Sequence, residues 1–256
     1  MDLSHNEIKA FLEEKTERYN RPDFIHGDPI SIPHAYSHKA DIEIAGFFAA
    51  TLSWGKRETI VSNARRLMRL MGNSPYDFVM SHRTDDLKKM DYFVHRTFQP
   101  ADAKYFIRAL RGIYQRHASM EEVFASAATA ESVIPGIIHF HQTFFSISHP
   151  LRTRKHVSNP AKGSPAKRIN MFLRWMVRND KRGVDFGLWS KLRPAQLSCP
   201  LDLHSGNVAR KLGLISVRQN NLKALSELDL ALRKMDPHDP VKYDFALFGL
   251  GIFEQF

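Results

Sequence analysis

The chain has 256 residues, of which 43% are hydrophobic and 25% are charged, and its formal net charge is +10 at pH 7. These proportions are ordinary for a soluble globular protein, and the length suffices for one large domain or two lobes. The single cysteine, Cys199, excludes an internal disulfide framework and a four-cysteine iron–sulfur cluster, so we expect a reducing compartment, the cytoplasm.

The N-terminal segment does not have the pattern of a signal peptide. Residues 1–20 are charged and lack an apolar central stretch. The longest apolar run, Ile42 to Leu52, is interrupted by Glu43 and is too short to cross a bilayer. We therefore expect no interaction with a membrane.

Apolar residues recur at helical spacing along most of the chain, and no alternating β-branched run of strand length occurs. The pattern predicts an all-α fold, with a fully buried helix over residues 40–53 because that stretch is apolar on nearly every face. The predicted helices cover residues 5–20, 40–53, 57–71, a short segment from 74, 100–117, 120–127, 132–145, a segment after 165, a segment from about 205, and 241–251.

The segment 159–178, NPAKGSPAKRINMFLRWMVR, predicts a short hairpin followed by a helix. Gly163 is suited to a bend with positive φ, and Pro165 is suited to a helix start. The helix should bury its apolar face, while Lys167 lies in the first turn and Arg174 and Arg178 lie on the opposite face. A cation is disfavoured at a helix start, which favours the neutral amine that a nucleophilic lysine requires.

The segment CPLDLHSGNVARKLGL places one acid, Asp202, between Pro200 and the start of a helix. A carboxylate at a helix entrance is most often a cap. A catalytic carboxylate is the alternative, and one residue can serve as both.

Positive charge is concentrated between Leu151 and Arg182. This segment contains ten basic residues and a single acid, Asp180. A solvated surface would explain such a run. Because the charge coincides with a hairpin and a helix start, which are both suited to phosphate, binding of a polyanion is the better explanation.

Three motifs together resemble the helix-hairpin-helix (HhH-GPD) DNA glycosylase superfamily. They are the hairpin Gly163-Ser-Pro-Ala-Lys167, the segment Pro200-Leu-Asp202-Leu-His204, and Val208-Ala-Arg-Lys-Leu-Gly-Leu214. The resemblance extends over about residues 28–251. It implies one glycosylase-like domain (1–256) made of two helical lobes, lobe 1 over about 40–150 and lobe 2 over about 1–39 and 151–256, with the hairpin motif at 159–178.

The resemblance also implies the catalytic residues. Lys167 matches the nucleophilic lysine of members that also cleave the strand, and Asp202 matches the catalytic aspartate. The sequence departs from the pattern at Pro165, where the superfamily has a second hairpin glycine that donates a backbone N–H to phosphate. The long insertion, residues 179–198, is similar to the archaeal 8-oxoguanine DNA glycosylase branch.

The base pocket expected from the resemblance has two parts. In the archaeal branch a late helix supplies an acid and an aromatic ring four residues apart, which Asp244 and Phe248 match. It is equally consistent with the sequence that Asp244 interacts with the dipole at the start of its helix and that Phe248 is a ring of the hydrophobic core. Phe186 and Trp189, in the insertion, are expected either to line the pocket or to form a hydrophobic latch on the core.

The DNA-binding residues expected from the hairpin and from the end of the buried helix form a larger set. Trp54 is suited either to stacking on bases or to the core. The expected DNA contacts are Trp54, Lys56, Arg57, Lys162, Gly163, Ser164, Arg168 and His204.

The sequence gives no support for a metal site or a cofactor. His34 and His38 lie four residues apart, but no third ligand is placed by sequence to complete a site. We therefore expect a base-excision glycosylase and AP lyase that acts without cofactor or metal on double-stranded DNA with a damaged base, with 8-oxoguanine the leading substrate, and that is a monomer. A non-catalytic DNA-binding helix-hairpin-helix protein is the alternative.

Overall fold

The computed structural model describes residues 4–256, so residues 1–3 of the charged N-terminal segment lie outside it. Over the described range the chain is all-α, as predicted, and it has no β-strand beyond an isolated bridge between His95 and Phe98. The α-helices are α1 (His5–Tyr19), α2 (Lys39–Leu52), α3 (Arg57–Leu70), α4 (Pro75–Ser81), α5 (Pro100–Tyr114), α6 (Met120–Ala125), α7 (Ile134–Phe144), α8 (Lys167–Val177), α9 (Leu203–Lys211), α10 (Leu222–Met235) and α11 (Tyr243–Phe253). Short 3-10 helices lie between them: η1 (Pro22–Ile25), η2 (Pro29–Ser31), η3 (Pro33–Ala35), η4 (Asp86–Met90), η5 (Leu151–His156), η6 (Pro160–Lys162), η7 (Pro194–Gln196) and η8 (Pro240–Lys242).

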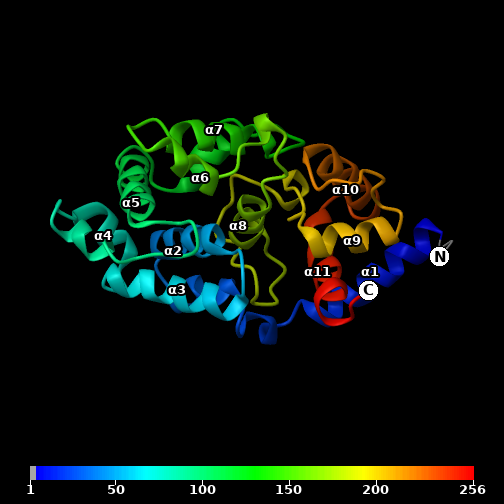
Figure 1. Cartoon of the computed structure of the whole chain (residues 1–256). Helices are drawn as coiled ribbons and strands as arrows, with labels where there is room; N and C mark the ends of the chain where they lie inside the picture. The colour runs from blue at the N-terminus through cyan, green and yellow to red at the C-terminus, as the bar shows by residue number, and fades with distance from the viewer. Residues whose placement is uncertain (1–3) are drawn as a thin grey trace.

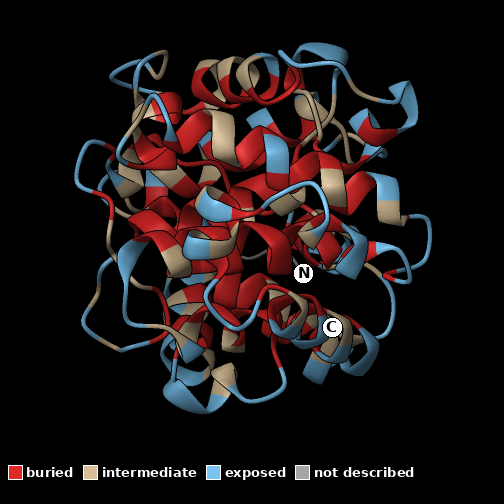
Figure 2. Cartoon of the chain, turned by 90° about the vertical axis from the view of Figure 1, so that its left-hand side faces the viewer, coloured by how far each residue is buried: buried red, intermediate tan, exposed pale blue. Residues whose placement is uncertain are grey.

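Buried apolar side chains form two clusters. The larger cluster takes residues from α2 to α8, and the smaller one takes residues from α1, α9, α10 and α11. Figure 1 shows the same grouping, with α8 between the two groups of helices. Figure 2 shows that buried residues line the inner faces of the helices while most loops are exposed. The clusters meet at α11, since Phe245 belongs to the larger one and Leu247 to the smaller one.

Helix α2 is the centre of the larger cluster, as its sequence predicted, and twelve of its fourteen residues are buried. Its one buried acid, Glu43, accepts hydrogen bonds from the Tyr114 hydroxyl (2.6 Å), the Ser119 hydroxyl (2.6 Å), the Met120 backbone N–H (3.1 Å) and Trp189 Nε1 (2.8 Å). A buried carboxylate is costly unless it is paired in this way. Glu43 therefore joins α2 to α5, α6 and the 179–198 insertion.

Helix α8 packs on α2, which is a helix of the expected lobe 1. The sequence had led us to expect α8 in lobe 2. Gly46 allows the close approach, because a Cβ there would lie 3.2 Å from Met176 Cε and 3.4 Å from Phe172 Cε2. Phe172 and Met176 are both fully buried, and each contributes roughly 1.5–3 kcal/mol to folding. The hairpin helix thus belongs to the larger cluster, and the expected boundary between lobes at residue 151 does not separate the clusters.

Helix α10 was not predicted. Its buried residues Leu225, Leu228, Leu232 and Met235 follow the spacing of one helical face, which is the signal that could have identified it. None of the described helices is long and apolar enough to cross a membrane.

Candidate active site

A cleft of about 760 Å³ opens where the hairpin, the start of α9 and the end of α2 come together. Its walls also include the start of α3 and one face of α11. The residues that line it include Asp28, Trp54, Arg57, Ser164, Lys167, Arg168, Met171, Asp202, His204, Asn220 and Phe248. Many of the residues expected from the sequence to act on DNA therefore lie around one cavity.

Two left-handed residues shape the hairpin. Gly163 has φ 79°, as predicted for a glycine bend. Ala166 has φ 45°, which is strained for a residue with a side chain, and its N–H donates to the Ser164 hydroxyl (3.2 Å). The Asn170 amide donates to the Pro165 carbonyl (2.9 Å) and holds the hairpin against α8. This arrangement starts α8 at Lys167, as predicted.

The second motif caps α9. Asp202 Oδ1 accepts a hydrogen bond from the Ser205 backbone N–H (3.0 Å), and the Ser205 hydroxyl accepts one from the Asp202 N–H (2.8 Å). The Asn220 amide donates to the Asp202 carbonyl oxygen (2.6 Å). These contacts fix the carboxylate at the helix start and leave Oδ2 turned to the cleft.

The hairpin and the cap bring Lys167 and Asp202 together. Lys167 Nζ lies 3.7 Å from Asp202 Oδ2, and the two side chains are 26% and 22% exposed. The pair is thus accessible from the cleft without being fully solvated. An amine beside a carboxylate in such a position can attack a carbon centre and lose a proton to the acid.

At the inner end of the cleft lies a smaller hollow with about 30 Å³ of free space, room for a single water molecule. Asp244 and Phe248 line it with Lys167 and Asp202, so the expected acid and aromatic ring do lie beside this lysine and aspartate. Burial raises the pKa of Asp244 to about 6, while the Arg174 guanidinium opposes this rise.

Asp28 is a second acid at this inner end, and sequence reasoning gave it no role. It is buried, it lines both the cleft and the inner hollow, and its Oδ1 accepts from the Ile30 N–H (3.0 Å). Burial raises its pKa, although Arg57, Arg174 and Lys167 act against that shift. An acid directly before a proline in a loop looked like a turn, and only the three-dimensional structure brings it to Lys167.

The rim of the cleft carries the remaining residues expected to contact DNA. The half-buried Trp54 ring lies between the guanidinium groups of Arg96 (5.0 Å) and Arg168 (6.0 Å), so it is held at the rim and is not part of the core. The Arg57 guanidinium lies over the Phe248 ring (5.4 Å). His204 is exposed at the opening.

Arg168 does not point to solvent as expected for a phosphate contact. Its guanidinium donates to the Thr51 carbonyl (2.5 Å) and the Lys155 carbonyl (3.4 Å), which ties the hairpin helix to the end of α2. Burial lowers the pKa of Arg168 to about 10, so it remains charged at neutral pH. Ser164 lines the cleft, whereas the exposed residues Lys56, Lys162 and Gly163 lie outside its lining.

Trp189 and Phe186 do not line the cleft. Trp189 is 3% exposed, and its ring packs edge-on against Phe172 (5.5 Å) while its N–H donates to Glu43. Phe186 stacks on His34 at 4.2 Å. The 179–198 insertion is therefore the hydrophobic latch that was the alternative to a pocket wall.

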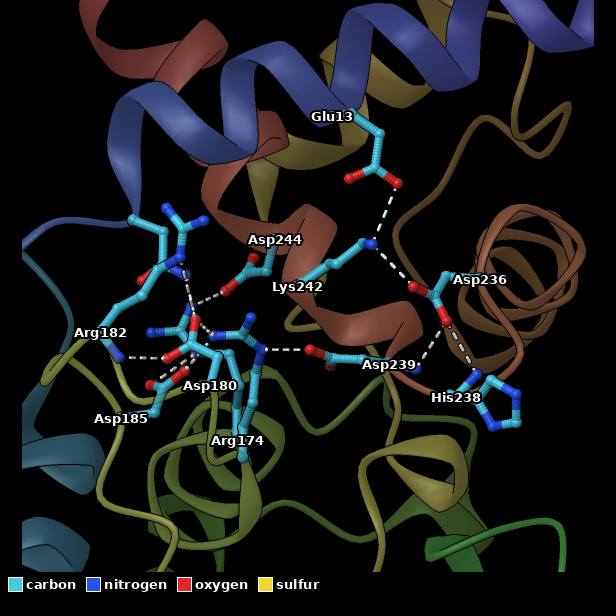
Figure 3. Close-up of polar contacts among 12 residues, drawn as sticks. Glu13, Arg174, Asp180, Arg182, Asp185, Asp236, His238, Asp239, Lys242 and Asp244 are labelled. Carbon is cyan, nitrogen blue, oxygen red and sulfur yellow. Dashed lines mark hydrogen bonds and ion pairs between the residues drawn. The ribbon is translucent and has the colours of Figure 1, made fainter.

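Much of the basic segment is paired internally, which the sequence did not predict (Figure 3). Arg174, expected on an exposed face, is buried and forms ion pairs with Asp185 (3.2 Å) and Asp244. Arg178, also buried, binds Asp185 (3.2 Å) and Asp239 (2.8 Å). Buried charges are tolerated because each has opposite charges around it. These arginines hold the inner end of the cleft together and are not available to a polyanion.

The start of the same segment is also paired. Arg152 binds Asp102 at 2.7 Å, and Thr153 and His156 donate to the same carboxylate at 2.7 and 3.2 Å. Burial raises the pKa of Asp102, but the hydrogen bonds from His156, the Gln99 backbone N–H and Thr153 outweigh it and lower the pKa to about 2. Only part of the charge counted between residues 151 and 182 is therefore open to solvent.

The histidines and acids of residues 4–256 form no cluster of metal-ligand type. Among the described residues no group of three or more His, Cys, Asp or Glu side chains is placed to hold a metal ion. His34 Nε2 donates to the Val184 carbonyl oxygen (2.8 Å), and His38 Nδ1 lies 3.5 Å from Asp41 Oδ2. The two histidines thus have separate partners.

Comparison with known proteins gives a family but no function. The chain belongs to the family described as "Protein of unknown function (DUF2400)", whose model matches residues 28–253. No curated protein and no solved structure matches the chain. The matched range begins at Asp28 and contains Lys167, Asp202 and Asp244, so the whole cleft constellation lies within the family region.

Proposed function

For this member of the DUF2400 family, we propose DNA base excision: a DNA glycosylase and AP lyase of the two-lobed helix-hairpin-helix type. The observation that carries the proposal is the 3.7 Å separation of Lys167 Nζ and Asp202 Oδ2 within the cleft. The motif resemblance around both residues supports it. The proposed substrate is double-stranded DNA with a damaged base, acted on by a cytoplasmic monomer.

The target nucleotide must leave the base stack, because its glycosidic bond is out of reach inside a duplex. The neutral amine of Lys167 then attacks C1′, a C–N bond to the enzyme forms, and the bond to the base breaks. The base leaves with the bonding electron pair and takes up a proton from solvent. The Asp202 carboxylate stabilises the positive charge on the sugar and accepts the proton that the attacking amine loses.

Strand cleavage follows from the same intermediate. Opening of the sugar ring gives a Schiff base between Lys167 and C1′, which acidifies the hydrogens on C2′. Loss of one of these protons expels the 3′ phosphate by β-elimination, and water then releases the sugar from the lysine. Neither step needs a group beyond Lys167, Asp202 and water.

The leading substrate is 8-oxoguanine. This choice depends on Asp244 and Phe248, which line the inner end of the cleft. An acid there accepts hydrogen bonds from the N–H groups of a purine edge, and a ring packs on its face. The free space at this end, about 30 Å³, must enlarge to admit a base. The proposal therefore includes rearrangement of side chains around Phe248 on binding.

Base release under single-turnover conditions tests the proposal. Duplexes with 8-oxoguanine, uracil, thymine glycol or an abasic site are incubated with wild type, Lys167→Gln and Lys162→Gln. Lys162 is the matched control, because it is an exposed lysine of the same hairpin outside the lining of the cleft, and saturating enzyme offsets the loss of a phosphate contact there. We expect release of one base by wild type and Lys162→Gln and not by Lys167→Gln.

One observation favours a second candidate, a DNA-binding protein without turnover. Pro165 has no N–H to offer a phosphate, and Gly163 donates its own N–H to the Pro160 carbonyl (2.8 Å). The hairpin is therefore poorer in free backbone donors than the motif it resembles. Salt-sensitive binding to every duplex without release of any base would select this alternative.

A further inference from the structure

Helix α3 carries a row of arginines that the catalytic proposal does not use. Arg65 and Arg69 are exposed, and within residues 4–256 neither side chain has an ion-pair or hydrogen-bond partner. They contrast with Arg174 and Arg178, which both form ion pairs with the buried Asp185. Part of the exposed positive charge near the cleft thus lies on α3, outside the expected basic segment.

The surface around this row is hollowed. Arg57 lines the cleft and also a second hollow of about 670 Å³, which Arg65 and Arg69 line as well. Arg65 and Arg69 further line a third hollow of about 300 Å³ beside Tyr36. Because neighbouring hollows share these side chains, they lie next to one another along α3, and we name this surface the α3 groove and define it by Arg57, Arg65 and Arg69. Glu58 is the one acid that lines the second and third hollows.

The dimensions of the groove suit a nucleic acid. Arg57 and Arg69 are twelve residues apart on one helix, which corresponds to about 18 Å along its axis. A DNA strand advances roughly 3.4 Å per nucleotide, so this length matches about five nucleotides. Arg65 and Arg69 lie on the same face of α3, one helical turn apart. Guanidinium groups in such a row can each bind a phosphate, and the exposed site keeps their cost of desolvation low.

We propose that the α3 groove binds the phosphodiester backbone of one DNA arm beside the flipped nucleotide. The arm enters at Arg57, on the wall of the cleft, and continues past Arg65 to Arg69. The inference rests on the proposed function for the location of the lesion at Lys167. It adds a binding surface, on one side of the lesion only, that neither the hairpin nor the catalytic pair supplies.

Asymmetric duplexes test the inference. Each carries a stable abasic-site analogue, with a long arm on the 5′ side, on the 3′ side, or on neither. The short arms end within about three base pairs of the lesion, or roughly 10 Å at about 3.4 Å per base pair, which is too short to reach Arg65. Affinities are measured against salt concentration for wild type, Arg65→Gln/Arg69→Gln and the control Arg108→Gln/Arg116→Gln. The control removes two exposed arginines at α5 and keeps the change in net charge equal.

We expect the α3 variant to lower the slope of log affinity against log salt by about 2, on only one of the two long-arm duplexes. The control variant and the short-arm duplex should show no such change. An unchanged slope on both long-arm duplexes, or an equal loss on the short-arm duplex, would overturn the inference.

Trapping of Lys167 separates this inference from the proposed function. At low salt, where all duplex is bound, borohydride should trap the α3 variant as well as wild type. If wild type is not trapped but the one-sided slope change occurs, the glycosylase proposal fails and the groove stands. If trapping occurs and the slope does not change, the groove fails and the glycosylase proposal stands.

Discussion

Asp202 Oδ2 lies 3.7 Å from Lys167 Nζ while Oδ1 of the same carboxylate caps helix α9. The two roles depend on each other, because the cap fixes the torsion of the side chain and thereby directs Oδ2 to the amine. The sequence left cap and catalyst as alternatives for Asp202. In the structure the residue is a cap, and the geometry leaves its second oxygen free for chemistry.

Replacing Asp202 with Asn should separate the two roles. Asn caps helices as well as Asp does, so the free energy of unfolding should change by less than about 1 kcal/mol. The amide cannot accept the amine proton, so base release should fall by roughly 10²–10⁴-fold. Urea denaturation and single-turnover assays measure the two effects. Asp202→Ala serves as a comparison that loses both roles, and a normal rate of base release by Asp202→Asn would rule out a catalytic carboxylate.

The buried arginines should matter for stability. Arg174→Gln removes the arginine partner of Asp244 and one of the two arginine partners of Asp185, and both carboxylates are at least nine-tenths buried. An uncompensated buried charge costs roughly 3–5 kcal/mol, so the midpoint of urea denaturation should fall steeply. Asp244→Asn should cost less, because Arg174 keeps its bond to Asp185. A loss below 1 kcal/mol for Arg174→Gln would mean that the ion pairs do not hold this end of the cleft together.

Trp54, expected at DNA, and Trp189, expected either in the base pocket or in a latch on the core, should behave differently. Trp54→Ala should weaken binding to a duplex with an abasic-site analogue by about 1–3 kcal/mol, the usual value of one stacking ring, and leave folding intact. Trp189→Phe should leave binding unchanged and destabilise the fold by roughly 1–3 kcal/mol, because it removes the indole N–H from the buried Glu43 carboxylate. Fluorescence anisotropy and thermal denaturation measure these effects. The reverse pattern would place the DNA contact in the 179–198 insertion.

Acidification should destabilise the protein through His141. Burial, with nearby positive charge from Arg154 and Lys162, lowers the pKa of His141 to about 4 from its usual 6.5. Between pH 6.5 and 4 the unfolded chain therefore binds a proton at His141, while the native protein does not. The contribution of His141 to the free energy of unfolding is fully present above pH 6.5 and should be lost as the pH falls toward 4, by up to about 3 kcal/mol.

His141→Gln provides the control for this pH dependence. Burial raises the pKa of Asp229 and Asp244 to about 6, which opposes the loss, so the difference between wild type and variant is the quantity to measure. The variant should lose less stability than wild type over this interval. Parallel curves of unfolding free energy against pH would show that His141 does not cause the loss.

Local pattern sufficed for most of the fold. The apolar run of α2 and the one-sided faces of α3 and α5 predicted helices whose ends lie within a few residues of those observed. The pattern did not predict that the charged face of α8 is buried against other parts of the chain. Arg174 and Arg178 looked like an exposed face, but their partners Asp239 and Asp244 lie more than sixty residues away along the chain. Such pairing depends on tertiary structure, which periodicity does not contain.

The site was predictable only where a motif marked it. Lys167 and Asp202 were found by resemblance, since thirty-five residues separate them and no spacing rule joins them. Asp28 was missed because an isolated acid before a proline has the pattern of a turn. Trp189 carried an aromatic signal that fits a pocket and a core equally well, and only its burial decides between them.

The most direct test of the account is the identity of the residue that forms a covalent bond with DNA. Wild type, Lys167→Gln and Lys162→Gln are incubated with the substrate duplex and sodium borohydride, and the adduct is located by peptide mass. We expect an adduct on Lys167 in wild type and in Lys162→Gln, and none in Lys167→Gln. An adduct on any other residue, or base release without trapping in wild type, would contradict the nucleophilic role of Lys167.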